Sequence, residues 1–468
     1  MGETFTGGAD SLLSEDATAS PERLSLVVLW SRSEPERAGE VLLVLPRRGG
    51  WVVGRQDTPA PGRLGLVRQR PGHNEPAGEF SARRLSRTQL QVRLDRGRLE
   101  VRNAGRLEMR VNNQATTQAS LVSGDLLELD RELLLLCAPR PETLPTGGLA
   151  PHPFGLADAD GIVGETPEAW ALRSQIALCA ASGGHVLIQG ASGSGKELVA
   201  QAIHRQGPSR REIVSRNAST FPEGILDAEL FGNLRDYPNP GIPARPGAIG
   251  EADRSSLFLD ELGETSHAMQ AHLLRVMDSG EYQRLGESRA RTAQFRLIGA
   301  TNRDLDTLKH DFLARFERRV HLPDLNARVA DIPLLARHIL GRLAADNPAL
   351  FPEGPPPLHP DLIRSLVRHR YTTNAREVSR LLWASVEHWR QHGGKYLSAT
   401  SALPRAAAPA PTSTPEALTR EDILAAYRHF NGVQARVPAY LGLRDRFQLA
   451  RLEKKLGITR ADRAATQD

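Results

Sequence analysis

Residues 185–204 read HVLIQGASGSGKELVAQAIH, and this stretch decides the fold of the middle of the chain. His185–Gln189 has the apolar centre of a short buried strand, and Leu198–His204 has the pattern of a helix. Between them, glycines let the backbone curl tightly, so that backbone N–H groups and the start of the helix face an anion. The spacing Gly-x4-Gly-Lys is typical of a phosphate-binding loop, in which Lys196 contacts the terminal phosphates of a nucleotide.

Two further predicted strands end in polar groups. Ser256–Leu259 leads into the adjacent carboxylates Asp260 and Glu261. The first is suited to hold Mg²⁺ and the second to polarise an attacking water. Phe295–Ala300 leads into Thr301-Asn302, which are placed to sense a γ-phosphate. We therefore expect an ATP-hydrolysing site at the carboxyl edge of a parallel α/β sheet.

Composition bounds the class of protein. The 468 residues are too many for one core and suggest about three domains. The longest apolar runs, Val41–Leu45 and Leu133–Cys137, are far shorter than a membrane span, and no signal peptide is evident. Cys137 and Cys179 fit no disulfide or metal framework, so we expect a cytoplasmic protein with no membrane partner. The net charge of +5 favours an anionic partner such as DNA, but an arginine-biased proteome explains it equally well.

The chain divides by composition into a multidomain protein: a β-sandwich, an α/β ATPase with an α-helical lid, and an all-α DNA-binding module. The expected segments are a disordered 1–21, a sandwich at 22–138, a linker at 139–156, an α/β part at 157–327, a lid at 328–396, a Pro/Ala linker at 397–416, a helical module at 417–460 and a tail at 461–468. Strands of the sandwich are predicted at Leu24–Trp30, Glu40–Leu45, Gln89–Leu94, Leu99–Val101 and Leu126–Leu136.

Several segments resemble the central AAA+ domain of sigma-54-dependent transcription activators over about residues 161–390. They are GASGSGKELVAQAIH, ELFG, SLFLDELGE, LLRVMDSGEYQRLGE, RLIGATNRDL and DIPLLARHIL. The resemblance implies a homo-oligomeric ring, expected to be a hexamer, with ATP and Mg²⁺ bound between subunits, and RNA polymerase holoenzyme as a partner.

Roles carry over by position. The resemblance implies that Lys196 contacts phosphate, Asp260 holds the metal, Glu261 activates water and Asn217 restrains Glu261. It also implies a second-sensor role for Arg376 in the lid. The expected nucleotide-binding residues are Gly190, Ser192, Gly193, Ser194, Gly195, Lys196, Glu197, Thr301, Asn302 and Arg376. Glu197 stands where a Ser or Thr usually supplies a hydroxyl to magnesium.

Two departures from the family change the expected function. The family's GAFTGA loop, which touches sigma-54, is replaced here by Asp236–Gly241, DYPNPG, whose two prolines fix φ and remove N–H donors. Productive sigma-54 contact is therefore not expected. The two trans-acting arginines align with Lys309 and Arg315, and lysine lacks the planar fork of arginine. Either hydrolysis is slow, or the domain binds ATP mainly for structure.

The N-terminal part resembles a forkhead-associated domain. Gly54-Arg55, Ser86-Arg87 and the later turn Ser123–Asp125 carry the resemblance. It implies that Arg55, Ser86 and Arg87 bind a phosphothreonine protein. Gln89 replaces the usual histidine and Leu107 the usual asparagine, so a sandwich that keeps the scaffold without the affinity stays open.

The C-terminal part reads as helix Leu418–Phe430 followed by Gln434–Leu441, a turn at Gly442 and helix Arg444–Leu456. This plan resembles the factor-for-inversion-stimulation (Fis) type helix-turn-helix. Candidate DNA contacts are Arg444, Arg446, Gln448, Arg451, Lys454 and Lys455. A helical hairpin that only dimerises is the alternative.

The leading hypothesis is an ATP-dependent, DNA-binding transcription regulator controlled by a phosphopeptide or a partner protein. Two alternatives remain: an AAA+ ATPase that remodels a protein other than polymerase, and a signalling scaffold in which ATP only shapes assembly.

Overall fold

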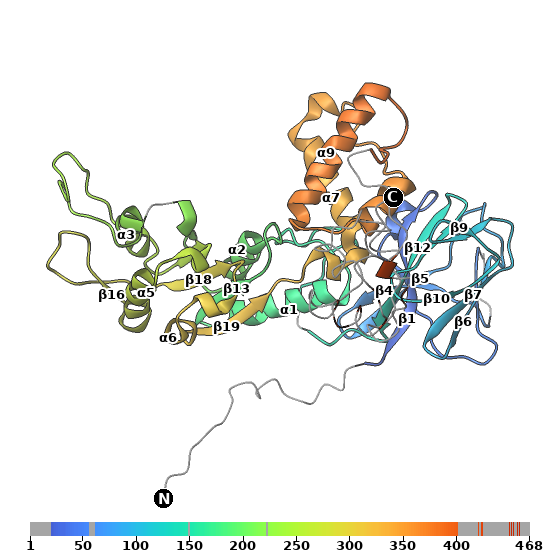
Figure 1. The fold of residues 1–468 in the computed structure, drawn as a ribbon, viewed down its shortest axis with the longest axis horizontal. Helices are drawn as coiled ribbons and strands as arrows, with labels where there is room; N and C mark the ends of the chain where they lie inside the picture. The colour runs from blue at the N-terminus through green and yellow to red at the C-terminus, as the bar shows by residue number, and fades with distance from the viewer. Residues whose placement is uncertain are drawn as a thin grey trace, which may run out of the picture. The chain divides into compact units, whose positions relative to one another are not determined.

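The computed structural model describes residues 20–55, 61–147, 150–220 and 223–400, together with isolated positions between 420 and 458. The chain separates into two compact units, residues 1–403 and 404–468. The first unit contains a β-sandwich, a parallel α/β sheet and a helical lid (Figure 1). In the parts of the chain that are described, no helix has both the length and the apolar character needed to cross a bilayer.

The N-terminal sandwich consists of two antiparallel sheets. Its strands are β1 Glu22–Ser31, β2 Val41–Leu42, β3 Trp51–Val53, β4 Leu66–Arg70, β5 His73–Gly78, β6 Leu90–Asp95, β7 Arg98–Asn103, β8 Met109–Val111, β9 Gln114–Ala115, β10 Gln118–Leu121, β11 Leu126–Leu129 and β12 Leu133–Pro141. The larger sheet has the order β5-β4-β2-β1-β12-β11-β8-β9 and the smaller one the order β10-β7-β6-β3. Inward-facing side chains such as Leu26, Leu90 and Leu135 fill the space between the sheets.

The single strand predicted over Leu126–Leu136 is wrong, because a turn divides it into β11 and β12. Asp130 and Arg131 adopt positive φ values of 35° and 51°, which let the chain reverse. The charged triplet 130–132 inside an otherwise apolar run was the signal for this turn. β12 also continues to Pro141, so three residues that the sequence suggested for the linker pair with β1.

The α/β part has a five-stranded parallel sheet of order β14-β15-β18-β13-β19. Its strands are β13 His185–Gln189, β14 Val214–Asn217, β15 Ser256–Asp260, β18 Arg296–Thr301 and β19 Phe316–His321. Its helices are α1 Pro167–Ala181, α2 Lys196–Gln206, α3 Glu223–Phe231, α4 Ala248–Glu251, α5 His267–Ser279 and α6 His310–Leu313, and β16 Glu281–Tyr282 pairs with β17 Arg291–Thr292. Apolar clusters cover both faces of the sheet, as expected for a parallel sheet.

The lid consists of three helices, α7 Ile332–Asp346, α8 Pro360–Arg368 and α9 Asn374–His392. Its core is continuous with the outer face of the larger sandwich sheet. Val27 and Leu29 of β1 and Leu134 of β12 belong to the same buried cluster as lid residues such as Leu366. The sandwich and the lid therefore share one hydrophobic core.

Polar contacts tie the same two parts together. The Arg364 guanidinium on α8 forms an ion pair with Glu128 at 2.5 Å, and Arg368 donates to the Asn112 side chain at 2.9 Å. The indole N–H of Trp30 donates to the carbonyl of Leu358 at 2.8 Å. Since these groups are partly buried at the junction, replacing one partner of a pair would leave the other without its hydrogen bond.

The segment after β12 is also packed. Arg70 of β4 lies over the rings of Phe154 and Trp170, and donates to the His152 carbonyl at 3.0 Å. The backbone N–H of Gly155 donates to Glu165 at 2.7 Å. The residues between the sandwich and α1 thus form a wedge that both parts contact.

Candidate nucleotide site

The predicted phosphate loop lies between β13 and α2. Gly193 and Gly195 have φ values of 71° and 102°, which side chains with a Cβ rarely adopt. The N–H of Gly190 donates to the Thr301 carbonyl at 3.1 Å and ties the loop to the end of β18. Gly195 caps α2 without any side-chain hydrogen bond, so the N–H groups of the first turn are available to an anion.

Lys196 is buried within this loop. Its Nζ donates to the carbonyls of Gly190 and Ala191 at 3.0 and 3.3 Å. The Ser194 hydroxyl is buried and has no hydrogen-bond partner in the described part of the chain. A buried hydroxyl without a partner is unfavourable by itself, and a phosphate at this loop would satisfy it. The loop therefore fits a nucleotide.

The two carboxylates lie at the same sheet edge. Asp260 ends β15, and the N–H of Glu261 donates to its Oδ1 at 2.8 Å. Burial raises the pKa of Glu261, and the Asp260 charge raises it further, while Lys196 and Arg376 act in the opposite direction. Lys196 lies in the phosphate loop and Arg376 contacts that loop through Ser192, and the charges of both act on Glu261. We therefore treat the lysine, the carboxylate pair and the lid arginine as one candidate site.

The metal-binding capacity of this edge is limited to two carboxylates. Within the described ranges, no group of three or more His, Cys, Asp or Glu side chains is arranged to hold a metal. Asp260 and Glu261 fit a magnesium ion that takes most of its remaining ligands from phosphate oxygens and water, as is usual for this metal.

The lid closes directly on the phosphate loop. Arg376 donates to the Ser192 hydroxyl at 3.0 Å, and the N–H of Ala375 donates to the Gly193 carbonyl at 3.1 Å. Asn374 donates to the Ser192 carbonyl at 3.1 Å and accepts from the N–H of Leu325 at 2.7 Å. Sequence reasoning assigned no role to Asn374, although it is buried at a φ of 47°.

A second lid residue holds this closing turn in place. Burial opposes the ionisation of Glu377, yet hydrogen bonds from Thr372, Thr373 and His369 lower the pKa of its carboxyl to about 2. The carboxylate is therefore ionised at neutral pH and fixes the turn that presents Asn374 and Arg376.

The other residues predicted for the nucleotide site are Asn217, Thr301, Asn302 and Glu197, and they differ in burial and in hydrogen bonding. The side-chain Oδ1 of Asn217 accepts from the N–H and hydroxyl of Ser219 at 2.9 and 2.7 Å. Asn217 pairs in register with Asp260 across β14 and β15, but its restraint of Glu261 stays a prediction. Thr301 is buried with its hydroxyl accepting from a backbone N–H, whereas Asn302 is exposed. Glu197 is exposed and accepts from Gln201 at 3.4 Å.

The two predicted trans-acting cations lie on the surface around α6. Arg315 is exposed and bound through two nitrogens to Asp278, with Nη2 and Oδ2 3.1 Å apart. The exposed Lys309 precedes α6, and its backbone N–H donates to Gln270 at 2.9 Å. A role across a subunit boundary requires a second chain, so it stays a prediction for both.

Asp236–Gly241, the residues that stand in place of GAFTGA, lie within a longer loop, residues 233–246, which is called the proline loop below. It is braced by its own contacts. Asn233 is buried and donates to the Pro243 carbonyl at 2.9 Å. The N–H of Asp236 donates to Ile242 at 2.8 Å, and the Asp236 carboxylate accepts from the N–H of Gly241 at 2.7 Å. The loop therefore has a defined shape.

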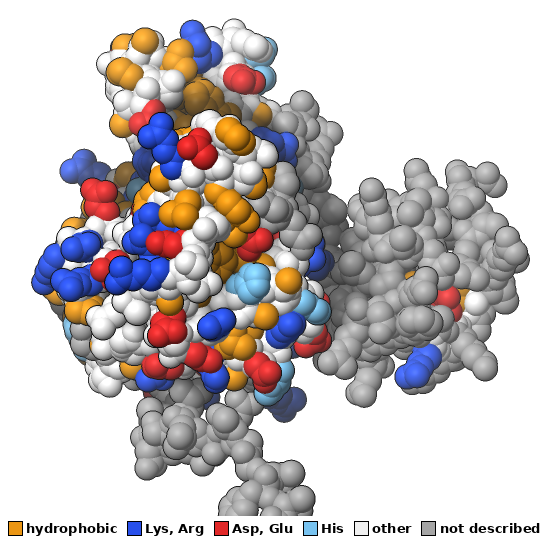
Figure 2. All heavy atoms as spheres, turned by 90° about the vertical axis from the view of Figure 1, so that its left-hand side faces the viewer, with side chains coloured by type: hydrophobic (Ala, Val, Ile, Leu, Met, Phe, Trp, Pro, Cys, Tyr) orange, Lys and Arg blue, Asp and Glu red, His pale blue; other side chains and the backbone are white. Residues whose placement is uncertain are grey.

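The proline loop also rests on the turn between β16 and β17. The N–H of Leu234 donates to the Leu285 carbonyl at 3.0 Å, and the ring of Tyr237 covers Gly286 so closely that no Cβ would fit there. Figure 2 looks onto this end of the molecule, where basic side chains gather beside acidic and apolar ones. Tyr237 is 42% exposed and available to a partner.

The predicted phosphopeptide residues lie together at one end of the sandwich. The N–H of Arg55 donates to the Ser86 carbonyl at 3.0 Å, and the Ser86 hydroxyl accepts from the N–H of Arg106 at 3.0 Å. Arg87 is exposed. Gln89, which stands in place of the family's histidine, accepts from the N–H of Ser86 at 3.1 Å and so keeps the turn in shape.

Of the predicted DNA contacts, only Arg451 lies among the described residues, where it is exposed. Arg444, Arg446, Gln448, Lys454 and Lys455 lie outside them, as does nearly all of the predicted helix-turn-helix.

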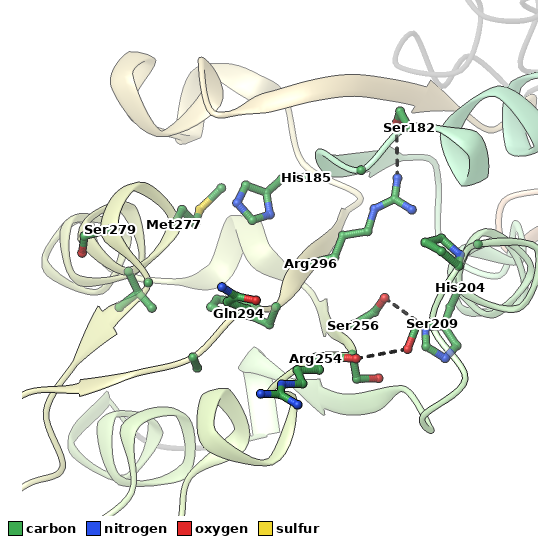
Figure 3. A pocket seen from close by; sticks show the side chains of 18 residues that line it. Ser182, His185, His204, Ser209, Arg254, Ser256, Met277, Ser279, Gln294 and Arg296 are labelled. Atoms are coloured by element: carbon green, nitrogen blue, oxygen red, sulfur yellow. Dashed lines mark hydrogen bonds between the residues drawn. The ribbon is translucent and has the colours of Figure 1, made fainter.

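A separate cavity of about 570 Å³ lies at the opposite, amino-terminal edge of the sheet. His185, Ser256 and Arg296, the first residues of three strands, line it (Figure 3). Arg296 donates to the Cys179 and Gly184 carbonyls at 2.6 and 2.8 Å. Arg296 thus binds a carbonyl in the last turn of α1.

Comparison with known proteins agrees with this geometry. Residues 162–322 match the family model of the sigma-54 interaction domain. The transcriptional regulatory protein ZraR of Escherichia coli is 35% identical over 321 residues, which cover 65% of this chain and 71% of that protein. The chain belongs to the sigma-54-dependent family of transcriptional regulators.

Other members overlap with smaller parts of their length. The Nif-specific regulatory protein of Azotobacter vinelandii is 37% identical over 230 residues, and the match covers 47% of this chain and 43% of that regulator. The chain thus spans less than half of this relative. A crystal structure of NtrX from Brucella abortus in complex with ADP aligns with a TM-score of 0.48 and 27% identity, over 63% of this chain and 70% of that one.

Proposed function

We propose that this family member is an ATP-hydrolysing, DNA-binding transcription regulator that acts as a homo-oligomeric ring. The observation that carries the proposal is the convergence of Lys196, the Asp260-Glu261 pair and Arg376 on one phosphate-binding loop. Residues 162–322, which match the sigma-54 interaction domain, include this loop and both carboxylates. The match therefore supports a nucleotide site there.

Each residue has a definite task in this proposal. Lys196 exchanges its two backbone carbonyls for phosphate oxygens, and the first turn of α2 adds N–H donors. Asp260 holds magnesium, which when bound neutralises phosphate charge. Glu261 accepts the proton of the attacking water. Arg376 links the state of the nucleotide to the lid.

Loss of the Lys196 charge should weaken nucleotide binding. Among the described residues, Lys196 is the only buried cation in the loop. Lys196→Ala removes it, and we expect ATP affinity to fall by about tenfold to hundredfold. Isothermal titration of the full chain with MgATP measures this. Gln201→Ala, an exposed change on the same helix, is the control. Equal affinity of Lys196→Ala and the unchanged chain would refute the proposed site.

A second part of the proposal concerns the polymerase. The proline loop lacks the phenylalanine and threonine of the family's contact, and its prolines and internal hydrogen bonds restrict its conformation. We infer that the regulator does not open sigma-54 promoters and acts as a repressor or through another form of polymerase. A non-polymerase substrate of the ATPase is the alternative, favoured if no promoter DNA is bound.

The proline-loop inference has a direct measurement. In open-complex assays with sigma-54 holoenzyme, the native chain should show no activity while it hydrolyses ATP. Replacing residues 236–241 by the sequence GAFTGA restores the family's contact residues and should give at least partial activity. Robust open-complex formation by the native chain would overturn the inference.

Control of the ring is proposed to come from the N-terminal sandwich. A backbone hydrogen bond joins Arg55 to the turn that carries Ser86 and the exposed Arg87, which supports a phosphothreonine-binding role for these residues. Because the sandwich shares its core with the lid, a peptide held there acts on a part that is already joined to the nucleotide site. The scaffold alternative, in which ATP only shapes assembly, predicts binding without turnover.

A further inference from the structure

A cavity of about 460 Å³ lies where the sandwich meets the lid, and we call it the junction pocket. One side comes from the end of β1 and the residues after it, and the other from α7, α8 and the segment 355–358. The pocket therefore exists only while the two parts are docked. Its volume is that of a site for a small organic molecule, and such sites are common at domain boundaries.

The walls of the junction pocket are apolar and fixed in place. Trp30 presents its ring while its indole N–H is held by the Leu358 carbonyl at 2.8 Å. Leu29, Leu340 and Ile363 are at most 3% exposed and belong to the shared core. Tyr396 adds a second aromatic ring. Such walls favour a flat, apolar body.

The charges around the pocket have one sign. Arg32, Arg337 and Lys395 line it, and no Asp or Glu among the described residues does. The guanidinium of Arg337 donates hydrogen bonds to the Pro35 and Gly155 carbonyls at 3.3 and 2.9 Å. Burial lowers its pKa, and Glu36 partly offsets that effect. Arg32 and Lys395 are exposed, and neither forms an ion pair with another described residue.

We propose that the junction pocket binds a small organic anion, an aromatic or similarly flat body that carries a carboxylate or sulfonate. The body would lie between Trp30 and Tyr396, and the acid would face Arg32 and Lys395. A molecule that contacts both walls binds only the docked state and so stabilises it. This site adds an effector to the proposed function, and its occupancy does not require ATP.

The test uses two fluorescent probes of nearly the same shape. Anilinonaphthalene sulfonate carries the acid, and phenylnaphthylamine lacks it. We expect the sulfonate to bind the full chain, and Arg32→Glu with Lys395→Glu to weaken that binding roughly tenfold through charge repulsion. The neutral probe should bind the double variant as it binds the unchanged chain, because the apolar walls are intact.

The matched control is Arg48→Glu with Arg83→Glu, which reverses two exposed charges on the sandwich away from the pocket lining. It should leave the affinity for both probes unchanged. The proposal fails if the sulfonate does not bind, if both double variants weaken it equally, or if the pocket variant weakens both probes alike. Lys196→Ala should retain the probe, so failure of the nucleotide site is distinguished from failure here.

Discussion

Glu261→Gln should reduce the rate of ATP hydrolysis by about 10²- to 10⁴-fold, the loss expected when a general base is removed. The amide has nearly the shape of the carboxylate but cannot accept the proton of the attacking water. MgATP affinity should stay within a few-fold, because Lys196 and the loop N–H groups supply the phosphate contacts. Steady-state phosphate release and equilibrium titration of the same preparations measure the two effects.

The control for this change is Glu251→Gln, which alters an exposed carboxylate on α4. It should hydrolyse ATP at the unchanged rate. If Glu261→Gln were as active as Glu251→Gln, the proposed base would be wrong. If the native chain and both variants bound ATP but none of them hydrolysed it, the scaffold alternative would be favoured.

Leu134→Ala should destabilise the sandwich and the lid together. Leu134 is fully buried in the core that these parts share, and truncation of a buried leucine costs about 2–5 kcal/mol. Since the cavity would open between β12 and the lid helices, one cooperative unfolding transition should shift as a whole. Urea denaturation followed by tryptophan fluorescence and by limited proteolysis of each part measures this.

Two comparisons sharpen the result. Leu135→Ala changes the neighbouring residue, which faces the opposite side of β12 and fills the inner sandwich core. Leu135→Ala should lower the free energy of unfolding by a similar amount, but the sandwich should be the first part to become sensitive to proteolysis. Leu178→Ala, at a 52% exposed position, should cost less than about 0.5 kcal/mol. Separate transitions in which Leu134→Ala affects only the sandwich would contradict a shared core.

The nucleotide site could be predicted largely from local sequence. β13, β15 and β18 were predicted within a residue of their observed bounds, because each is a short apolar run that ends at glycine, charged or polar residues. Parallel strands place such ends at one edge, which is why the loop that carries Lys196 and the carboxylate pair lie at the same edge of the sheet. Asn374 was missed because its role depends on a positive φ and on the distant Leu325 and Ser192.

The shared core was missed for a different reason. Leu133–Cys137 is apolar at every position, and it was predicted only as part of a sandwich strand and as too short for a membrane span. A strand that is apolar at consecutive positions is typical of one buried on both faces. Here one face packs in the sandwich and the other on the lid. The pattern indicates a covering element, but no local feature identifies which one.

The braced shape of the proline loop has a consequence for recognition. A surface segment that is already held in one conformation has little freedom left to lose when another molecule docks on it. Association there should depend on how well the surfaces match rather than on folding during the encounter. A substitution of Asn233 that removes its hydrogen bond to the Pro243 carbonyl should weaken such docking, even though this buried side chain would not contact the partner itself.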